Sequence, residues 1–331
     1  MKATRKPTLG ELARNLGLST ATVSRVLNNS VLVKEETRLR ILEGARELGY
    51  VKRTVRRQRV RAIPTIALVL PRSRETYRQL FYDPASLIES ITGAFAPGRV
   101  NIVTIVDGSD IGGARKLGGV DGWVFAFLRP EPELAAGLRD RGIPHVVINR
   151  TGPDLPFVAC DHGAGMATLL GRMLATGRQV RPFYLGLLPV AEVSRLRLAA
   201  LGAACATTGV PFGPADQREA ASLDEIDPAS VTGIAEAGHN ALVCFNDIVA
   251  IAALNAARSA GLRVPADLMI SGFDNTPVLS IAPQRIDTID LAVEEMGAAG
   301  AQWLRARIFD RDDKPLARLV AGRHVPGRTI Q

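Results

Sequence analysis

Residues 8–29, TLGELARNLGLSTATVSRVLNN, constrain this chain most, because they predict two short helices joined by a tight turn. Thr8 and Glu11 have the T-x-x-E spacing of a capping box, which starts a first helix over about residues 9–16. Gly17 follows this helix, and glycine accepts the positive φ that reverses a chain without steric cost. The stretch therefore predicts a helix, a sharp turn and a second helix.

The second helix begins after Ser19, which is placed to cap it. Its inward-facing positions are expected to be Val23, Val26 and Leu27. A third helix over about residues 35–48 is expected to close a small core through Ile41, Leu42, Ala45 and Leu48. The positions left outside are Thr20, Ala21, Thr22, Ser24 and Arg25. Small polar groups and one long donor suit base edges and phosphates, so the pattern indicates a helix-turn-helix whose second helix enters a DNA groove.

The positive charge of the chain is concentrated in its first fifth. The whole chain carries a formal charge of +8, yet residues 1–62 contain 15 Lys/Arg against five Asp/Glu. The remaining residues contain 26 Lys/Arg and 28 Asp/Glu and are therefore slightly acidic. A run of charge is often only a solvated face, but a basic module with a helix of this kind is expected to bind phosphates.

Several protein classes find no support in the sequence. The widely spaced Cys160, Cys205 and Cys244 predict buried free thiols in a reducing compartment. The chain has no apolar signal segment and no run of 18 apolar residues, so we expect a cytoplasmic protein without a membrane span. Nucleotide loops and catalytic motifs are missing, so we expect no enzyme and no cofactor. The four histidines lack metal-ligand spacing, which predicts no metal site: His145, His162, His239 and His324.

From residue 63 onward, apolar runs typical of strands alternate with helical stretches. We expect strands at 63–71, 100–106, 122–128, 144–149, 157–160, 183–188, 241–245 and 268–273. We expect helices at 85–95, 131–141, 163–176, 193–208, 246–260 and 292–308. Continuous apolar strands that alternate with helices are typical of parallel sheets covered on both faces. Two such sheets accommodate this number of strands better than one.

The string ATVSRVLN, followed by EETRLRILEGARELGYV, resembles the headpiece of the LacI/GalR (lactose-repressor) family of bacterial transcription regulators. The resemblance covers essentially the whole chain and is strongest in residues 8–50 and 157–290. It implies an N-terminal all-α helix-turn-helix headpiece and an α/β core of the periplasmic-binding-protein type. Such a core has two parallel-sheet subdomains with a ligand cleft between them.

The resemblance also implies the domain limits. The headpiece is expected at residues 1–50 and a basic hinge at 51–62. The N-terminal core subdomain is then 63–157 with 291–320, and the C-terminal subdomain is 158–290 with 321–331. The family's chain crosses three times between the subdomains, here near 157–160, 287–291 and 319–323. The loop after strand 63–71 is longer than is usual in the family, and the segment after strand 100–106 is too short for a full helix.

Three polar residues suggest a ligand site in the core. Asn246, which Asp247 follows, and Asp274 come directly after expected strands, where ligands bind in open α/β sheets. Arg197 supplies a fork of donors, and carboxylates and amides accept from sugar hydroxyls. Asn or Asp after a strand equally often caps the next helix, and the residues alone leave both interpretations open. The resemblance favours the ligand site, because sugar-responsive members hold their effector at these three positions and often carry Asp or Asn at that of Asn149.

Other core positions depart from the family or are ambiguous. Asp161 matches a position that anchors local structure rather than ligand. Ala126 stands where a polar group is common and Leu291 where an amide occurs, so the identity of a sugar does not follow. Arg72 and Arg74 in the lengthened first loop fit either a phosphorylated or carboxylated effector or, as we favour, plain solvated charges.

The hinge VKRTVRRQRVRA departs from the family most. In the family this segment folds on DNA and inserts a leucine wedge into the minor groove. Here Val55 is placed to make the contact between paired hinges, but Arg59 stands at the wedge position. Either the segment is a basic linker that adds non-specific phosphate attraction, or Arg59 enters a narrow minor groove with Val60 as a weaker wedge. Lys34 replaces a usual helix-capping Ser.

Together these features predict a sequence-specific regulator, expected to be a homodimeric repressor controlled by a small molecule, a sugar or sugar derivative. Its partners are a near-palindromic double-stranded operator and the effector. Base contacts are expected from Thr20, Ala21 and Arg25, phosphate contacts from Thr22, Ser24 and Asn28, and hinge contacts from Val55 and Arg59. The alternatives are a nucleoid-type DNA binder of low specificity, a sugar-binding transport protein and an enzyme on a Rossmann-like scaffold.

Overall fold

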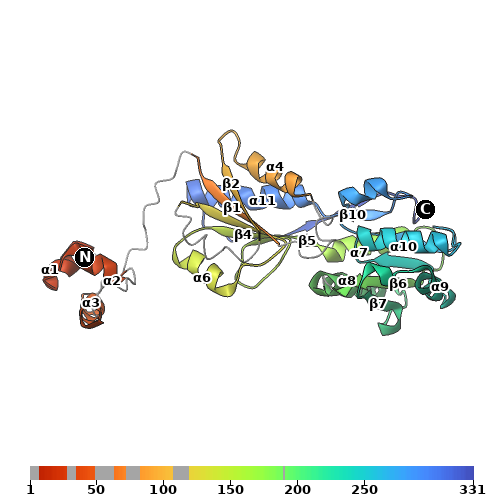
Figure 1. Cartoon of the computed structure of the whole chain (residues 1–331), viewed down its shortest axis with the longest axis horizontal. Helices are drawn as coiled ribbons and strands as arrows, with labels where there is room; N and C mark the ends of the chain where they lie inside the picture. The colour runs from red at the N-terminus through yellow and green to blue at the C-terminus, as the bar shows by residue number, and fades with distance from the viewer. Residues whose placement is uncertain (1–6, 28–34, 49–62, 72–82, 107–118, 189–190) are drawn as a thin grey trace. The chain divides into compact units, whose positions relative to one another are not determined.

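The computed structural model describes the chain except residues 1–6, 28–34, 49–62, 72–82, 107–118 and 189–190 (Figure 1). The described residues form two compact units, a helical headpiece and a larger core, and each is treated by itself. Predictions for seven residues fall outside the described residues: Asn28, Lys34, Val55, Arg59, Val60, Arg72 and Arg74.

The headpiece contains the three expected helices, α1 (Leu9–Asn15), α2 (Thr20–Leu27) and α3 (Glu35–Glu47). The capping box is confirmed, because the Thr8 hydroxyl accepts from the Glu11 backbone N–H at 3.3 Å. In return, the Glu11 carboxylate accepts from the Thr8 backbone N–H at 2.6 Å. Gly17 adopts the expected positive φ of 63°, and the Ser19 hydroxyl accepts from the backbone N–H of Thr22 at 3.1 Å. The turn and both helix starts therefore follow local sequence signals.

The headpiece has a small core of its own. Its buried side chains are Leu12, Ala13, Val23, Val26, Ile41 and Ala45. Leu48 packs against this core as expected, but Leu42 is 39% exposed, so its prediction as a core residue was wrong. Ile41, Ala45 and Leu48 repeat at intervals of four and three residues and share one face of α3. Leu42 lies about 100° around the helix from Ile41 and faces away.

The first sheet of the core has six parallel strands in the order β11-β5-β4-β3-β1-β2. These are β1 (Thr65–Leu70), β2 (Asn101–Val106), β3 (Gly122–Ala126), β4 (His145–Ile148), β5 (Phe157–Asp161) and β11 (Ala317–Ala321). The accompanying helices are α4 (Pro84–Ala94), α6 (Pro132–Asp140) and α11 (Val293–Arg305), which a π turn, Ala306–Asp310, extends. Strand β3 is shorter than expected because Phe127 turns out of it with a φ of 64°.

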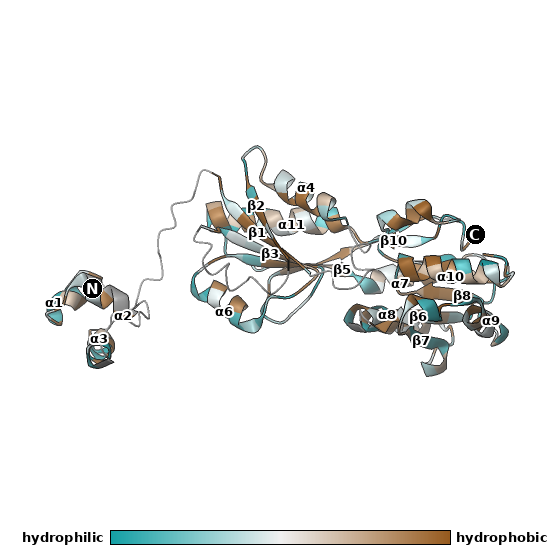
Figure 2. Ribbon diagram, in the orientation of Figure 1, coloured by the Kyte–Doolittle hydropathy of each residue, from teal (hydrophilic) through white to brown (hydrophobic). Residues whose placement is uncertain are grey.

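Both faces of this sheet are covered, as the alternation along β1 shows. Ile66 and Leu68 pack into a cluster that includes Leu87 of α4 and Leu304 of α11. The intervening Ala67 and Val69 belong to a second cluster that includes Leu138 of α6. Successive side chains of a strand point to opposite faces, so a continuous apolar strand needs a helix layer on each side. In Figure 2 the strands of this sheet are predominantly brown, as such burial requires.

The second sheet has four parallel strands in the order β7-β6-β8-β9. These are β6 (Pro182–Leu187), β7 (Gln217–Ala220), β8 (Ala241–Cys244) and β9 (Met269–Ser271). The helices are α7 (His162–Leu174), α8 (Ala191–Thr208), α9 (Pro228–Glu236) and α10 (Asp247–Ser259), with short 3-10 turns at Pro214–Asp216, Leu223–Glu225 and Pro277–Ile281. The expectation of two parallel sheets is therefore confirmed.

A separate antiparallel pair joins β10 (Thr288–Asp290) to β12 (Arg323–Val325). The expected crossover near 287–291 contains β10, and the one near 319–323 runs from β11 into β12; none of these three was predicted as a strand. Sequence analysis also missed β7, whose QREA is mostly polar at the edge of its sheet, and α9. The start of α9 did carry a signal, because Asp227 caps it and Pro228 is its first residue. The three cysteines are free and buried, as predicted.

Candidate functional site

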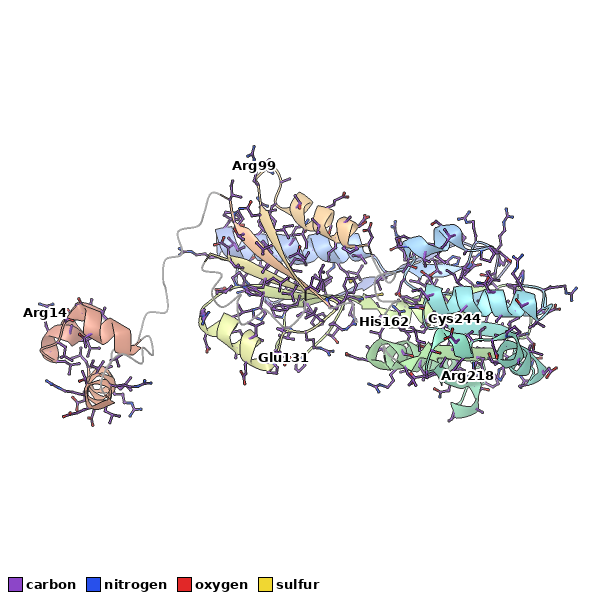
Figure 3. The ribbon with its side chains drawn as sticks, in the orientation of Figure 1. Arg14, Arg99, Glu131, His162, Arg218 and Cys244 are labelled. Atoms are coloured by element: carbon purple, nitrogen blue, oxygen red, sulfur yellow. The ribbon has the colours of Figure 1, made fainter. Side chains whose placement is uncertain are left out.

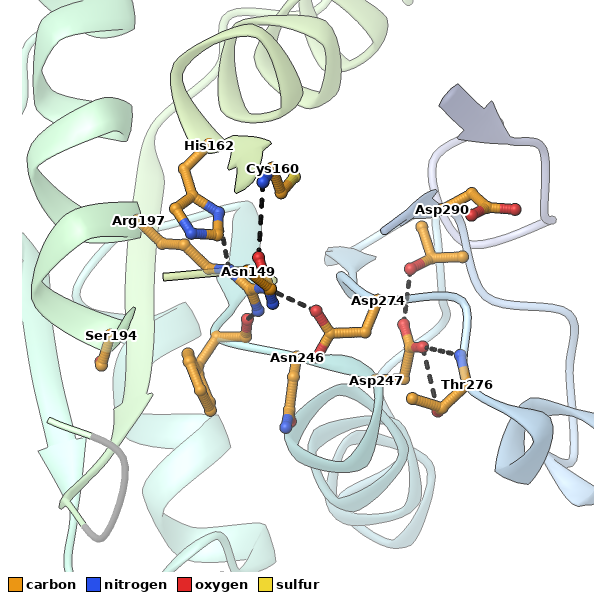
Figure 4. A network of polar contacts seen from close by, with 12 residues as sticks. Asn149, Cys160, His162, Ser194, Arg197, Asn246, Asp247, Asp274, Thr276 and Asp290 are labelled. Carbon is orange, nitrogen blue, oxygen red and sulfur yellow. Dashed lines mark hydrogen bonds and ion pairs between the residues drawn. The ribbon is translucent and has the colours of Figure 1, made fainter. Parts of the chain in front are cut away.

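Polar residues from several elements converge where strands of both sheets end (Figure 4). Asn149 follows β4, His162 follows β5, Asn246 follows β8, and Asp274 comes after β9. Arg197 reaches them from α8. Because the carboxyl ends of parallel strands lie at one edge of a sheet, residues far apart in sequence meet there. Figure 3 places His162 where the chain passes from the first sheet into α7.

Arg197 is the centre of this network and is almost completely buried, with 1% of its surface exposed. One terminal nitrogen donates to the Phe245 carbonyl at 2.6 Å, and the other donates to the Asp274 carboxylate at 2.5 Å. The guanidinium carbon lies 3.9 Å from the centre of the Phe273 ring. A guanidinium held by a carboxylate, a carbonyl and an aromatic face is fixed in position.

Asp274 forms an ion pair with Arg197, and the sequence had suggested both residues for the same ligand site. Its φ of 104° is unusual for a residue other than glycine. Burial raises the pKa of its carboxyl, and the charge and hydrogen bond of Arg197 act against that rise. Strained backbone and a paired buried charge are both features that concentrate at functional sites.

Asn246 serves first as a helix cap. Its side-chain oxygen accepts from the Val249 backbone N–H at 3.0 Å, which starts α10. Its amide nitrogen is buried and has no hydrogen-bond partner among the described residues. The capping interpretation is therefore correct for the oxygen, while the amide N–H₂ is left as an unsatisfied buried donor.

Asn149 forms hydrogen bonds with residues other than the Arg197–Asp274 pair. It is buried with a φ of 57°, and its side-chain oxygen is 3.4 Å from the Cys160 backbone nitrogen, which donates to it. That contact links the ends of β4 and β5. No bond joins Asn149 to Arg197 in the described part of the chain. Asp161 caps α7 through the Ala164 N–H at 2.9 Å, which confirms its structural role.

Two residues of the site were missed by sequence analysis, His162 and Arg150. The Nε of Arg197 lies 3.5 Å from Nδ1 of His162, and burial together with Arg197 and Arg150 lowers the pKa of His162 to about 3. His162 is therefore neutral at physiological pH. The available signal was their position just beyond a strand, His162 directly after β5 and Arg150 two residues after β4, but many other residues share such a position.

Asp247 lies behind the site, next to Asn246, and is fully buried. Its carboxylate accepts from the Thr276 backbone N–H at 2.6 Å, the Thr276 hydroxyl at 3.1 Å and the Thr288 hydroxyl at 2.5 Å. Burial, and to a lesser extent repulsion from the Asp274 carboxylate, raises the pKa of Asp247 to about 7. Asp247 thus ties α10 to the chain segments that follow β9. Ala126 and Leu291, the departures noted from sequence, are buried apolar residues.

In the headpiece, the predicted DNA-contacting residues Thr20, Ala21, Thr22, Ser24 and Arg25 all lie on α2. Thr20 is exposed at the first position of the helix. The hydroxyl of Thr22 is 2.8 Å from that of Ser19, within the cap of the helix. α2 thus carries every described candidate for DNA contact, as a reading helix requires.

Within the described ranges, no group of three or more His, Cys, Asp or Glu side chains is arranged to hold a metal ion. Every helix of the described part is too short or too polar to traverse a lipid bilayer.

Comparisons with known proteins decide the family. Residues 8–52 match the model of bacterial regulatory proteins of the lacI family, and residues 181–330 match the periplasmic binding protein-like domain. The HTH-type transcriptional regulator CelR of Thermobifida fusca is 30% identical over 98% of this chain and 98% of its own length. The chain belongs to the LacI family. An uncharacterised HTH-type regulator of Streptomyces limosus is also 30% identical, over 91% of this chain and 88% of its own.

Solved structures of LacI-family proteins share the fold. A complex of the regulator CelR with cellobiose matches with a TM-score of 0.65 and 24% identity over 98% of this chain and 99% of that one. The lac repressor dimer bound to operator and the anti-inducer ONPF matches with a TM-score of 0.63 and 21% identity over 98% and 99%. The predicted fold class, a helix-turn-helix headpiece with an α/β core, is therefore confirmed, as is the resemblance to LacI-family transcription regulators.

Proposed function

We propose that this LacI-family protein is a homodimeric repressor that binds a near-palindromic operator and is controlled by a small molecule, a sugar or sugar derivative. The observation that carries the effector part is the buried Arg197–Asp274 ion pair at the ends of the core strands. The cellobiose complex of CelR and the operator complex of the lac repressor, both alike in fold, support the same assignment. The two core subdomains are proposed to be residues 63–157 with 291–320 and residues 158–290 with 321–331.

Operator recognition is assigned to α2 in the major groove. Thr20, Ala21 and Arg25 are proposed to contact bases, because their side chains suit direct readout at base edges. Phosphate contacts are proposed for Thr22, Ser24 and Asn28, and hinge contacts for Val55 and Arg59. Phosphate contacts position a protein on DNA, whereas base contacts specify the sequence.

The effector is proposed to bind beside Arg197 and Asp274, with Asn246 and Asn149 at the margin. The Asp274 carboxylate accepts from hydroxyls, Arg197 donates, and the unsatisfied amide of Asn246 supplies a further donor. A ligand that engages the pair changes contacts between elements of the core and hence the geometry presented to DNA. By reciprocity, DNA changes effector affinity by the same factor, typically ~1–3 kcal/mol of coupling.

The test is to sequence genomic fragments that the purified full-length protein retains at about 150 mM salt, which suppresses counterion-release binding. We expect one or a few near-palindromic sites, and the genes beside them indicate which sugars to add. Diffuse retention without preferred sites contradicts the proposal and favours a nucleoid-type DNA binder.

The effector part is tested with Arg197→Lys, which keeps the charge but removes the guanidinium fork. We expect operator binding to persist and the response to the sugar to be lost. Arg195→Lys is the matched control, because Arg195 is exposed on the same helix. If both variants respond to the sugar like the wild type, the effector does not bind at Arg197.

A further inference from the structure

We propose that the effector of this site is an anion, whose carboxylate or phosphate group is bound by Arg150. The inference rests on the proposed function, because it concerns the same site, and it deepens that function by naming the chemical class of the ligand. Among the described residues, the guanidinium of Arg150 has no carboxylate that neutralises its charge.

Arg150 lies directly after Asn149 at the end of β4 and is partly buried in the core. One of its terminal nitrogens donates to the carbonyl of Asn149 at 2.6 Å. No carboxylate lies within ion-pair distance of Arg150 among the residues that the structure describes. A guanidinium has five N–H donors in a fixed fork, so most of its donor capacity is left for another partner.

The carboxylates close to Arg150 already have partners. Arg129 binds Glu192 through both terminal nitrogens, at 2.6 and 3.1 Å, and Arg197 binds Asp274. The charges that act most strongly on Arg150 are those of Glu192, Arg197, Arg129 and Asp274. Within this group, three guanidiniums stand against two carboxylates, and both carboxylates are bound by arginines other than Arg150.

The partial burial of this charge is unfavourable without a negatively charged partner. Burial lowers the pKa of Arg150 to about 10, so it stays protonated at neutral pH. His162, whose pKa is lowered by burial and by the charges of Arg197 and Arg150, is neutral and adds no further positive charge. Enclosed charges are normally paired, and an unpaired one beside a strained strand end is typical of a ligand site. Carboxylate and phosphate groups match the guanidinium fork in geometry and charge, whereas a neutral sugar leaves the charge unbalanced.

The experiment measures thermal unfolding of the full chain with inorganic phosphate, malonate or chloride at equal ionic strength. A bound anion stabilises the folded protein in a saturable way. We expect phosphate or malonate to raise the melting temperature of the core above that in chloride. Arg150→Gln should weaken the apparent affinity by about tenfold or more, because charged hydrogen bonds contribute about 1.5–3 kcal/mol.

Arg178→Gln is the matched control. Arg178 is also partly buried, and among the described residues its side chain donates to two backbone carbonyls, those of Pro265 and Ala266, outside the site. Its anion response should equal that of the wild type. Any anion binding to the basic headpiece is common to all three proteins and cancels in the comparison. A response to phosphate alone identifies a phosphate ester, and a response to malonate alone identifies a carboxylate.

Equal anion responses of the wild type and Arg150→Gln overturn the proposal, as does the lack of any saturable response in the wild type. Neutral sugars that bind equally well to both proteins overturn it too, yet they leave the proposed function intact. The proposed function fails separately, when no specific operator is retained in the genomic selection.

Discussion

Arg197 of α8 and Asp274 after β9 form an ion pair of 2.5 Å, and both side chains are more than nine-tenths buried. Removal of Arg197 leaves a buried carboxylate without its counter-charge. We expect Arg197→Met to lower the free energy of unfolding by about 3–5 kcal/mol, the range for a broken buried pair. Denaturant unfolding followed by circular dichroism measures this change.

The double variant Arg197→Met/Asp274→Asn separates the pair from the lone charge. Asn tolerates positive φ, so the strained backbone at Asp274 is kept. We expect the second substitution to restore part of the stability lost in the first, because the orphaned charge is gone. If the double variant is less stable than Arg197→Met, the cost does not come from an unpaired carboxylate.

Gly165 on α7 controls the position of the aromatic ring below Arg197. A Cβ added at Gly165 would lie 2.7 Å from two ring carbons of Phe273, far inside normal contact. Gly165→Ala therefore has to displace the ring that lies 3.9 Å from the Arg197 guanidinium. We expect a loss of about 1–3 kcal/mol, typical of overpacking, together with a weaker effector response.

Gly171→Ala on the same helix is the control. No atom lies within 4 Å of the added Cβ at Gly171, and the residue is in a helix. Replacement of an exposed helical glycine by alanine should stabilise the protein by about 0.5–1 kcal/mol. Opposite signs for the two variants in one unfolding assay support the packing argument. Equal effects would show that only helix propensity matters at Gly165.

Asp247 gives the protein a specific pH dependence. Burial raises its pKa to about 7 in the folded state, against ~3.9 in an unfolded chain. The folded state therefore holds this proton more tightly, so the stability is fully present below about pH 4 and is lost as the pH rises through about 7. We expect this group to contribute a decline of at most about 1.4 kcal/mol per pH unit in that window.

Asp247→Asn tests the assignment, because the amide cannot ionise. The difference in unfolding free energy between wild type and variant should change steadily from pH 4 to pH 7. It should then level off at higher pH. A difference that is constant over this window would mean that Asp247 is ionised throughout it.

Two substitutions in the headpiece should separate its folding stability from its recognition of DNA sequence. Thr8→Ala removes the hydroxyl that accepts from Glu11 and should cost about 1 kcal/mol of headpiece stability. It should weaken binding to every DNA sequence equally, since fewer molecules have a folded headpiece. Thr20→Ala alters an exposed residue of α2 and should change sequence preference with little effect on unfolding. Headpiece melting and binding to operator and random DNA measure both. A change of sequence preference in Thr8→Ala would contradict this division.

The sequence by itself determined the local structure and the fold class. The Thr8–Glu11 box, Gly17 and Ser19 are short-range signals, and each acts through backbone groups within three residues. Apolar strands alternating with helices fixed the parallel sheets, because such strands must be covered on both faces. The expected strand ends also indicated Asn246 and Asp274 as candidates for a ligand site.

Only the tertiary structure decided which of these side chains meet and what each one does. Arg197 and Asp274 are 77 positions apart in the chain and are brought together by helix and sheet packing. Asn246 proved to be a cap with one unsatisfied amide, and Arg150 proved to be a partly buried charge without a counter-ion among the described residues. Sequence gives the charge of a residue, but its burial and partners depend on elements distant in the chain, and these determine whether a charge is neutralised or left for a ligand.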